Sequence, residues 1–198
     1  MIALTSLTSA ADTYSGAGGA ALFLGALDGN DMVTGSSNND SLHGGAGDDQ
    51  INGEDGADYL NGGDGDDILN GGLDADMLNG DAGNDQLNGG QGDDILDGGE
   101  GTDVAIFSAN FSEYTITYLA NGTVSISHNS GTDGIDTLTN IEIACFADGD
   151  VALTGNPLTE LVDTYTGTGG NDFIDGLGGN DTLIGRGGND RLAVLAMT

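Results

Sequence analysis

Aspartate returns every nine residues along the first half of the chain. Nine successive nine-residue units run from Ala26 to Ile106, and the sixth position of every unit is aspartate. These residues are Asp31, Asp40, Asp49, Asp58, Asp67, Asp76, Asp85, Asp94 and Asp103. Neighbouring pairs such as Asp48 and Asp49 could form an acid–base couple. The strict period explains them better: one member is a cation ligand, and the other lies on the outside of the loop.

Glycine and one aliphatic residue share this period. The first position is glycine in every unit except the one that begins at Ala26. The eighth positions are Val33, Leu42, Ile51, Leu60, Leu69, Leu78, Leu87, Leu96 and Ala105. Glycines at positions one, two and four allow positive φ angles. We therefore expect a six-residue turn, then a three-residue strand whose middle side chain faces the interior. Two units make one coil, so alternate loops stack on the same side, with strands about 4.8 Å apart.

The charge of the chain makes such stacking unfavourable without a cation. There are 33 Asp and Glu residues against 2 Lys and Arg, giving a formal net charge of −31. Two carboxylates about 5 Å apart repel by about 0.8 kcal/mol in water and about 3 kcal/mol at an effective dielectric of 20. One buried aliphatic side chain per unit contributes only about 1.5–3 kcal/mol. A divalent cation between stacked loops would turn repulsion into attraction. Carboxylate and carbonyl oxygens suit calcium, whereas magnesium retains its waters.

The repeated unit resembles the RTX family of hemolysin-type calcium-binding nonapeptides, G-G-x-G-x-D-x-U-x. A second array from Gly167 to Ala193 follows the same pattern, with aspartate at its sixth positions: Asp172, Asp181 and Asp190. The resemblance implies an all-β fold, a right-handed parallel β-roll (RTX β-solenoid) with a β-rich capping segment and a second short β-roll. The expected divisions are 1–25 (degenerate repeat, with Leu22 in the aspartate slot), 26–106 (nine-unit roll), 107–166 (cap), 167–193 (second array) and 194–198 (tail).

The resemblance also implies the composition of each metal site. One loop gives the carbonyls of positions two and four and its aspartate. The loop 18 residues later gives the carbonyls of positions one and three and its own aspartate. One such site joins Gly45, Gly47 and Asp49 with Gly62, Asp64 and Asp67. Pairing every loop in this way predicts about eight calcium ions, seven in the long array and one between Asp172 and Asp190.

The metal-binding residues expected on this basis contribute either a backbone carbonyl or a carboxylate. They are Gly29, Asp31, Asn38, Asp40, Gly44, Gly45, Ala46, Gly47, Asp49, Gly53, Asp55, Gly56, Asp58, Gly62, Gly63, Asp64, Gly65, Asp67, Gly71, Gly72, Leu73, Asp74, Asp76, Gly80, Ala82, Gly83, Asp85, Gly89, Gln91, Asp94, Gly98, Glu100, Asp103, Gly170, Asp172, Asp181, Gly185, Gly187 and Asp190. Asn38 and Asp74 replace the fourth-position glycine, although Asn and Asp tolerate positive φ. The unit from Ala26 lacks its glycine pair and is expected to fray, with a weaker site.

The segment between the arrays is expected to be a cap without a catalytic centre. Two β-rich runs flank Asn121 and Gly122, which predicts a type I′ hairpin. Neither H-E-x-x-H nor G-x-S-x-G occurs in the sequence. His43 and His128 are expected on the surface, and Cys145 is expected to be a small core residue. We therefore expect no enzymatic activity from this chain.

Composition limits the partners. The only Lys and Arg residues are Arg186 and Arg191, which excludes nucleic acid and disfavours anionic membrane surfaces. No apolar run of about 18 residues occurs, so no membrane-spanning segment is expected. The N-terminus has no basic region typical of a Sec signal. The resemblance implies a secreted, extracellular bacterial protein exported by a type I secretion apparatus; the oligomeric state stays open.

Three functions remain to be compared. The first is a calcium-binding RTX repeat module that folds on binding Ca²⁺ outside the cell. The second is an accessory C-terminal part of a secreted hydrolase, protease or toxin whose catalytic domain is absent from this chain. The third is an ice-binding or adhesive coil, which would need a recurring row of threonine. The third position, which reads Asp28, Ser37, Ala46, Asp55 and onwards, has no such row.

Overall fold

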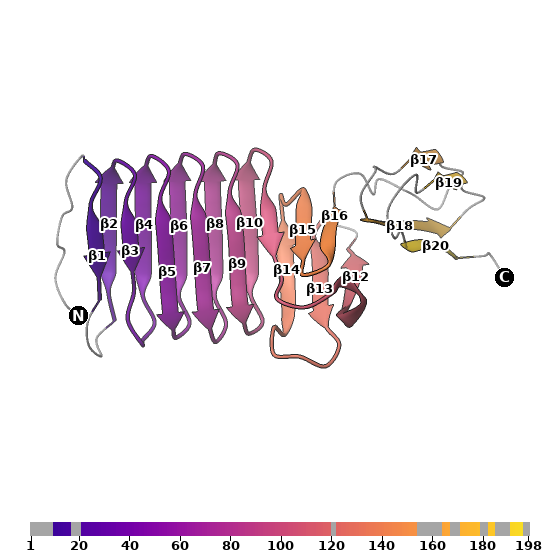
Figure 1. Ribbon diagram of the computed structural model, residues 1–198, viewed down its shortest axis with the longest axis horizontal. Coiled ribbons are helices and arrows are strands. Elements are labelled where there is room, and N and C mark those ends of the chain that lie inside the picture. The colour runs from indigo at the N-terminus through magenta and orange to yellow at the C-terminus, as the bar shows by residue number, and fades with distance from the viewer. Residues whose placement is uncertain are drawn as a thin grey trace.

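The protein is described from a computed structural model, which covers residues 10–16, 21–119, 122–153, 164–166, 171–178, 182–184 and 191–195. Nearly all of the regular structure in these ranges is β-strand, with one short 3-10 helix, η1, at Phe111–Glu113. Strands from successive units stack into a long flattened coil (Figure 1). The chain is therefore an all-β parallel β-solenoid, as the repeat predicts.

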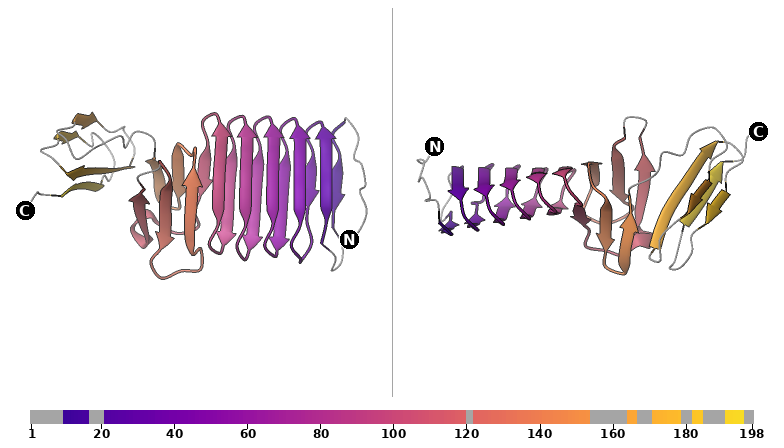
Figure 2. Two further views of the ribbon diagram at one scale, coloured as in Figure 1. Left: turned by 180° about the vertical axis from the view of Figure 1, so that it is seen from behind. Right: turned by 90° about the horizontal axis from the view of Figure 1, so that it is seen from above.

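Eleven strands form the coil. They are β1 (Thr13–Ser15), β2 (Phe23–Asp28), β3 (Met32–Thr34), β4 (Ser41–Ala46), β5 (Gln50–Asp55), β6 (Tyr59–Asp64), β7 (Ile68–Leu73), β8 (Met77–Ala82), β9 (Gln86–Gln91), β10 (Ile95–Glu100) and β11 (Val104–Ile106). The odd-numbered strands pair in parallel in one sheet, and the even-numbered strands pair in parallel in the other. Seen from above, the two sheets form two facing rows (right panel of Figure 2).

The register confirms that two units make one coil. Leu60 pairs with Leu78 in the even sheet, and Ile51 pairs with Leu69 in the odd sheet. The eighth-position side chains of both sheets point into the space between them, where each is at most 1 % exposed. One buried aliphatic residue per unit is therefore the whole core of the roll, as predicted. Each such residue contributes about 1.5–3 kcal/mol.

The strands are longer than the three residues predicted. Strand β5 covers positions seven to nine of one unit and positions one to three of the next, and most strands of the roll share this length of six residues. Glu54 pairs with Gly72 and Asp55 with Leu73, so the glycine-rich half also belongs to the ladder. Glycine is disfavoured in strands because it has no side chain to pack. Here the stacked backbone of the next coil supplies the partner, and only positions four to six remain as the turn.

The cap consists of β12 (Tyr114–Tyr118), β13 (Val124–His128), β14 (Ile135–Thr139), β15 (Ile143–Phe146) and β16 (Gly149–Ala152). Strands β12 and β13 form the predicted antiparallel hairpin. The predicted type I′ turn includes Asn121, which lies outside the described residues. Strand β14 extends the even sheet by pairing in parallel with β10, and β15 extends the odd sheet beside β11. Antiparallel strands β13 and β16 then cover their outer edges.

Two expectations for the cap are wrong. Cys145 is half-buried rather than a core residue, because its strand turns Ala144 and Phe146 inward. Cys145 instead faces Asp150, whose carboxylate, with burial, raises the pKa of the thiol to about 11. The side chain of His128 is only 7 % exposed rather than on the surface, since its ring stacks on Tyr114. His43 is half-buried between the rings of Phe23 and Tyr59.

Parallel stacking also occurs on either side of the nine-unit array and its cap, within the described residues. At the N-terminal end, Leu24 pairs with Leu42, and the backbone N–H of Leu22 donates to Asp40, which places Leu22 in the aspartate slot as predicted. At the other end are β17 (Thr164–Thr166), β18 (Asn171–Gly178), β19 (Thr182–Ile184) and β20 (Arg191–Leu195). Strand β17 pairs in parallel with β19, and β18 with β20, each across one full coil.

The ligands expected in the second array cannot be placed in full. Asp172 lies in β18, whereas Gly170, Asp181, Gly185, Gly187 and Asp190 lie outside the described residues. In the part of the chain that is described, no helix is long and apolar enough to cross a membrane.

Candidate metal centre

The sixth-position aspartates form a ladder along each edge of the roll. The backbone N–H of Asp31 donates to Oδ1 of Asp49 at 2.7 Å, and that of Asp49 donates to Oδ1 of Asp67 at 2.7 Å. On the opposite edge, the N–H of Asp58 donates to Oδ1 of Asp76 at 2.8 Å. Each carboxylate therefore uses Oδ1 to bind the preceding coil, which fixes its orientation.

The second oxygen of almost every aspartate in the ladders has no partner. These atoms are Oδ2 of Asp31, Asp49, Asp58, Asp67, Asp76, Asp85, Asp94 and Asp103, and all of them are buried. Leaving a buried polar atom unsatisfied costs about 1–3 kcal/mol, and more when the group is charged. Eight such atoms in one small roll indicate a ligand common to the loops.

The unpartnered oxygens converge on backbone carbonyls above the first-position glycines. A Cβ atom on Gly62 would lie 2.1 Å from Oδ2 of Asp67 and 2.9 Å from the carbonyl oxygen of Gly80. The same two kinds of atom crowd Gly44, where Oδ2 of Asp49 would be 2.0 Å away. Glycine at position one therefore keeps open a space lined by a carboxylate from one loop and a carbonyl from the next.

The groups expected for the first site come from two loops that stack one above the other. The carbonyl oxygens of Gly45 and Gly47 would lie 2.0 and 2.3 Å from Cβ atoms placed on the two glycines stacked above them. The carbonyl of Asp64 points back and accepts the N–H of Gly47 at 2.7 Å. Together with Oδ2 of Asp49, Oδ1 of Asp67 and the Gly62 carbonyl, the predicted ligand set consists of six oxygens. This hard-oxygen set matches calcium chemistry.

Two further gaps, one above Asp67 and one on the opposite edge above Asp76, have the same form. In the gap above Asp67, the Gly80 carbonyl and Oδ2 of Asp67 converge, and Gly65 N–H donates to the Ala82 carbonyl at 2.8 Å. On the opposite edge, the Gly89 carbonyl and Oδ2 of Asp76 lie 2.6 and 2.3 Å from a Cβ placed on Gly71. Both edges of the roll therefore present the same oxygen-lined gap.

Sequence comparison assigns this arrangement to a known family. The family model of the RTX calcium-binding nonapeptide repeat matches the chain in four copies, at residues 26–60, 47–78, 70–105 and 159–192. The chain belongs to the RTX family. RTX nonapeptide repeats bind Ca²⁺, and as a β-solenoid they are a structural module. No curated protein matches the chain.

One loop departs from the RTX form. In the unit that begins at Gly35, Oδ2 of Asp40 accepts the backbone N–H of Ser36 at 2.6 Å, and the Ser36 hydroxyl donates to Oδ1 at 3.2 Å. Asp40 is thus satisfied within its own loop. Asn38, at the fourth position, does not take a positive φ, whereas Asp74 at the equivalent position has φ of 73°. The loop therefore lacks the backbone form that its neighbours share.

The unit from Ala26 is not frayed, contrary to expectation. Ala26 is fully buried, and Asp31 is 3 % exposed with an unpartnered Oδ2. Leu27 adopts φ of 83° and Gly29 φ of 122°, so the backbone keeps the RTX form without a leading glycine pair. The stack in fact continues one step further, since the N–H of Asp12 donates to Oδ1 of Asp31 at 2.6 Å.

Electrostatics in the cation-free RTX roll oppose ionisation of the ladder. Burial, with repulsion from neighbouring aspartates, raises the pKa of Asp67 and of Asp76 to about 7, against lowering hydrogen bonds. The same causes raise the pKa of Asp49, Asp58, Asp85 and Asp94 to about 6. A bound divalent cation would reverse this effect by favouring the charged form.

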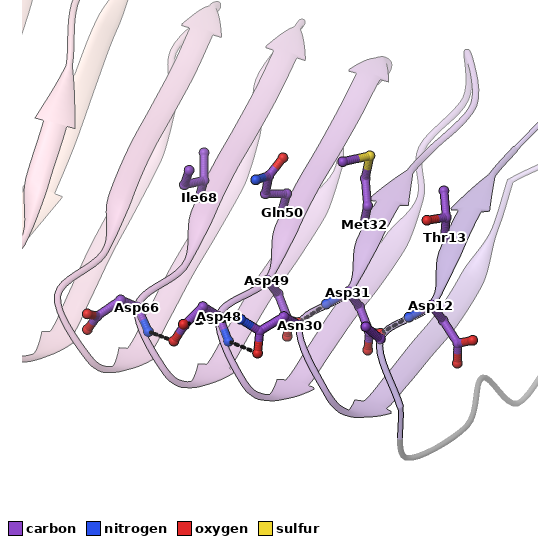
Figure 3. Close-up of a pocket in the computed structure, with 11 residues that line it drawn as sticks. Asp12, Thr13, Asn30, Asp31, Met32, Asp48, Asp49, Gln50, Asp66 and Ile68 are labelled. Carbon is purple, nitrogen blue, oxygen red and sulfur yellow. Dashed lines mark hydrogen bonds between the residues drawn. The ribbon is translucent and has the colours of Figure 1, made fainter.

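The fifth positions form a separate hydrogen-bonded row on the outside of one edge. The N–H of Asp66 donates to Asp48, and that of Asp48 donates to Asn30, so the bonds run opposite to those of the sixth position (Figure 3). Within the described ranges, no group of three or more His, Cys, Asp or Glu residues is arranged to hold a metal ion.

Sequence reasoning missed a polar network in the cap. Asp133 accepts hydrogen bonds from the Tyr114 hydroxyl and from Ser108 Oγ, the latter at 2.9 Å, and His128 Nδ1 lies 3.4 Å away. Burial acts to raise the pKa of Asp133, but these bonds lower it overall. Ser108 donates to the carboxylate of Asp133 and not to a histidine. The network connects distant segments of the cap, and no local sequence motif predicts it.

Proposed function

We propose that this chain is a calcium-dependent folding module, unfolded where calcium is scarce and folded outside the cell. The observation that carries the proposal is the set of eight buried, unpartnered Oδ2 atoms, most of which lie close to a backbone carbonyl of the next coil. If these atoms have no partner, the cost of burying them cancels much of the free energy gained by burying the single row of aliphatic residues. Calcium in the gaps satisfies the atoms and compensates the charge.

The ligands follow the gap geometry. In each gap, one loop supplies Oδ2 of its aspartate and the carbonyls of positions two and four. The next loop on that edge supplies the carbonyls of positions one and three and Oδ1 of its aspartate. About eight ions are expected over the chain. No catalytic role is proposed for any residue.

Export and localisation follow from mass action. A ligand that binds only the folded state stabilises it in proportion to RT ln(1 + [L]/Kd), so calcium concentration sets whether the chain folds. RTX repeats are typical of secreted bacterial proteins. An unfolded chain of net charge −31 suits passage through a narrow type I exporter, and millimolar external calcium would then fold it.

A cation titration tests the proposal. Far-UV circular dichroism of the whole chain in chelator is expected to be coil-like, and addition of millimolar calcium is expected to give a β spectrum. Magnesium at the same concentration is expected to leave the coil spectrum. A chelator-treated chain with full β signal and the same resistance to heat would overturn the proposal.

A further inference from the structure

The two aspartate ladders do not end with the last repeat. The backbone N–H of Asp94 donates to Oδ1 of Asp136 at 3.0 Å, and the N–H of Asp103 donates to Oε2 of Glu142 at 2.8 Å. Both acceptors belong to the cap, in the stretch between the family matches that end at 105 and begin at 159. They occupy the place that the sixth position of the next coil would take.

The segment around Asp136 follows the pattern of a repeat unit. The stretch Gly131–Thr139 reads GTDGIDTLT, with glycine at positions one and four, aspartate at six and leucine at eight. Gly134 has φ of 75° and stacks on Gly92, whose carbonyl oxygen would lie 2.1 Å from a Cβ on Gly134. Leu138 pairs with Leu96 and is 1 % exposed. The cap therefore continues the even edge of the roll.

The odd edge continues through Asn140 and Glu142. A Cβ on Gly98 would lie 2.2 Å from the Asn140 carbonyl oxygen and 2.6 Å from Oδ2 of Asp103. The first-position glycines of the array are crowded by the same pair of atoms. Asn140 has a positive φ of 51°, and Leu27, Glu54 and Asp81 at second positions of the array also have positive φ. Ala144 then pairs with Ala105 and is fully buried.

The last two array aspartates each have an oxygen that nothing in the structure satisfies. Asp94 and Asp103 are 1 % and 0 % exposed, and Oδ2 of each has no hydrogen-bond partner. Oδ2 of Asp103 points into the gap that the Asn140 carbonyl closes. These oxygens repeat the feature that marks the gaps inside the array.

We propose that the cap supplies the closing half of two further calcium sites, Asp94 with Asp136 and Asp103 with Glu142. This inference rests on the calcium-dependent function proposed above and extends it beyond the nonapeptides. Calcium at these gaps ties β14 and β15 to the roll, so ion binding couples folding of the array to docking of its cap. The antiparallel strand β13 then follows β14 in the even sheet, and the antiparallel strand β16 lies between β15 and β18 in the odd sheet.

The test uses the whole chain with neutral, isosteric changes. Asp136→Asn and Glu142→Gln each keep an oxygen that can accept the array N–H, but remove the charge. Asp150→Asn is the matched control, because Asp150 is an exposed carboxylate of the cap outside the ladders. Bound calcium is counted by equilibrium dialysis, and backbone order in 135–146 is followed by hydrogen exchange in saturating and limiting calcium.

Each single variant is expected to bind one ion fewer than the parent, and the double variant two fewer, with faster exchange in 135–146 at limiting calcium. Asp150→Asn is expected to match the parent in both measurements. An unchanged ion count in the double variant overturns the inference while leaving the calcium-dependent function standing. A parent chain that binds no calcium would instead overturn the proposed function itself.

A further variant decides the case in which Glu142→Gln does not fold. Glu142→Asp restores a carboxylate and places at this point the residue found throughout the ladder. Recovery of folding with the full ion count supports the site, and continued unfolding in saturating calcium overturns it.

Discussion

The backbone N–H of Asp49 donates to Oδ1 of Asp67 at 2.7 Å, while Oδ2 of Asp67 has no partner. One side chain thus faces two gaps, binding the preceding coil with one oxygen and presenting the other to the following coil. In the proposed function, each aspartate inside the array contributes to two neighbouring sites. The proposal therefore predicts cooperative calcium binding along each edge.

Loss of a shared carboxylate should weaken folding more than loss of one already satisfied. Asp67→Asn removes charge from two gaps, so the calcium concentration at the folding midpoint should rise about tenfold. Asp40→Asn should raise it much less, because Ser36 already binds that carboxylate. Both midpoints are read from far-UV circular dichroism. Equal shifts in the two variants would contradict the assignment of Oδ2 to the cation.

A methyl group at a first-position glycine should block a site without straining the backbone. Gly62 does not have a positive φ, and its Cβ would lie 2.1 Å from Oδ2 of Asp67. Gly62→Ala should therefore bind one ion fewer and need several-fold more calcium to fold. Gly25→Ala is the control, since nothing lies within 4 Å of its Cβ position. Calorimetric titration gives the ion count, and a full complement in Gly62→Ala would place the ion elsewhere.

The period of the sequence is sufficient to predict the coil, its core and the aspartate edges. Leu60 and Asp67 lie where the nine-residue frame puts them, because each stacked coil presents the same environment to each position. The frame fails where the spacing changes. Glu142 follows Asp136 by six residues and not nine, so its place in the ladder appears only when the two sheets are seen to pair separately with β14 and β15.

Other features depend on contacts that no local pattern records. The hydrogen bond from Ser36 to Asp40 depends on how one loop bends. Asp133 gathers Ser108, Tyr114 and His128 from distant parts of the cap. The strand character of the glycine pairs arises from the neighbouring coil, which overrides local preference. In each case a partner outside the repeat decides the outcome.

Truncation of a core residue should destabilise the calcium-loaded roll. Leu60 is fully buried in the single row of aliphatic residues. Leu60→Ala should lower the free energy of unfolding by about 2–5 kcal/mol, from lost burial and the cavity left behind. Ile95→Ala, at a side chain 46 % exposed, should change it by about 0.5 kcal/mol or less. Urea unfolding in saturating calcium measures both, and a Leu60→Ala effect no larger than that of Ile95→Ala would contradict a one-layer core.

Protons should compete with calcium for the ladder. Burial raises the pKa of Asp67 from its ordinary value of 3.8 to about 7, and that of Asp49 to about 6. Between those values and 3.8 the folded, cation-free state holds more protons than the unfolded chain, so it gains stability as pH falls and loses it as pH rises through about 7.

Two measurements check this linkage. In metal-free buffer, the β signal of the chain should increase as pH falls from about 8 to about 5. The affinity of the folded chain for calcium should fall over the same interval, because each ion must then displace protons from the ladder. His43 and His128 lie outside the gaps, so a His43→Gln variant should keep both trends. A calcium affinity of the folded chain that stays constant across this pH range would show that the buried carboxylates do not hold the ion.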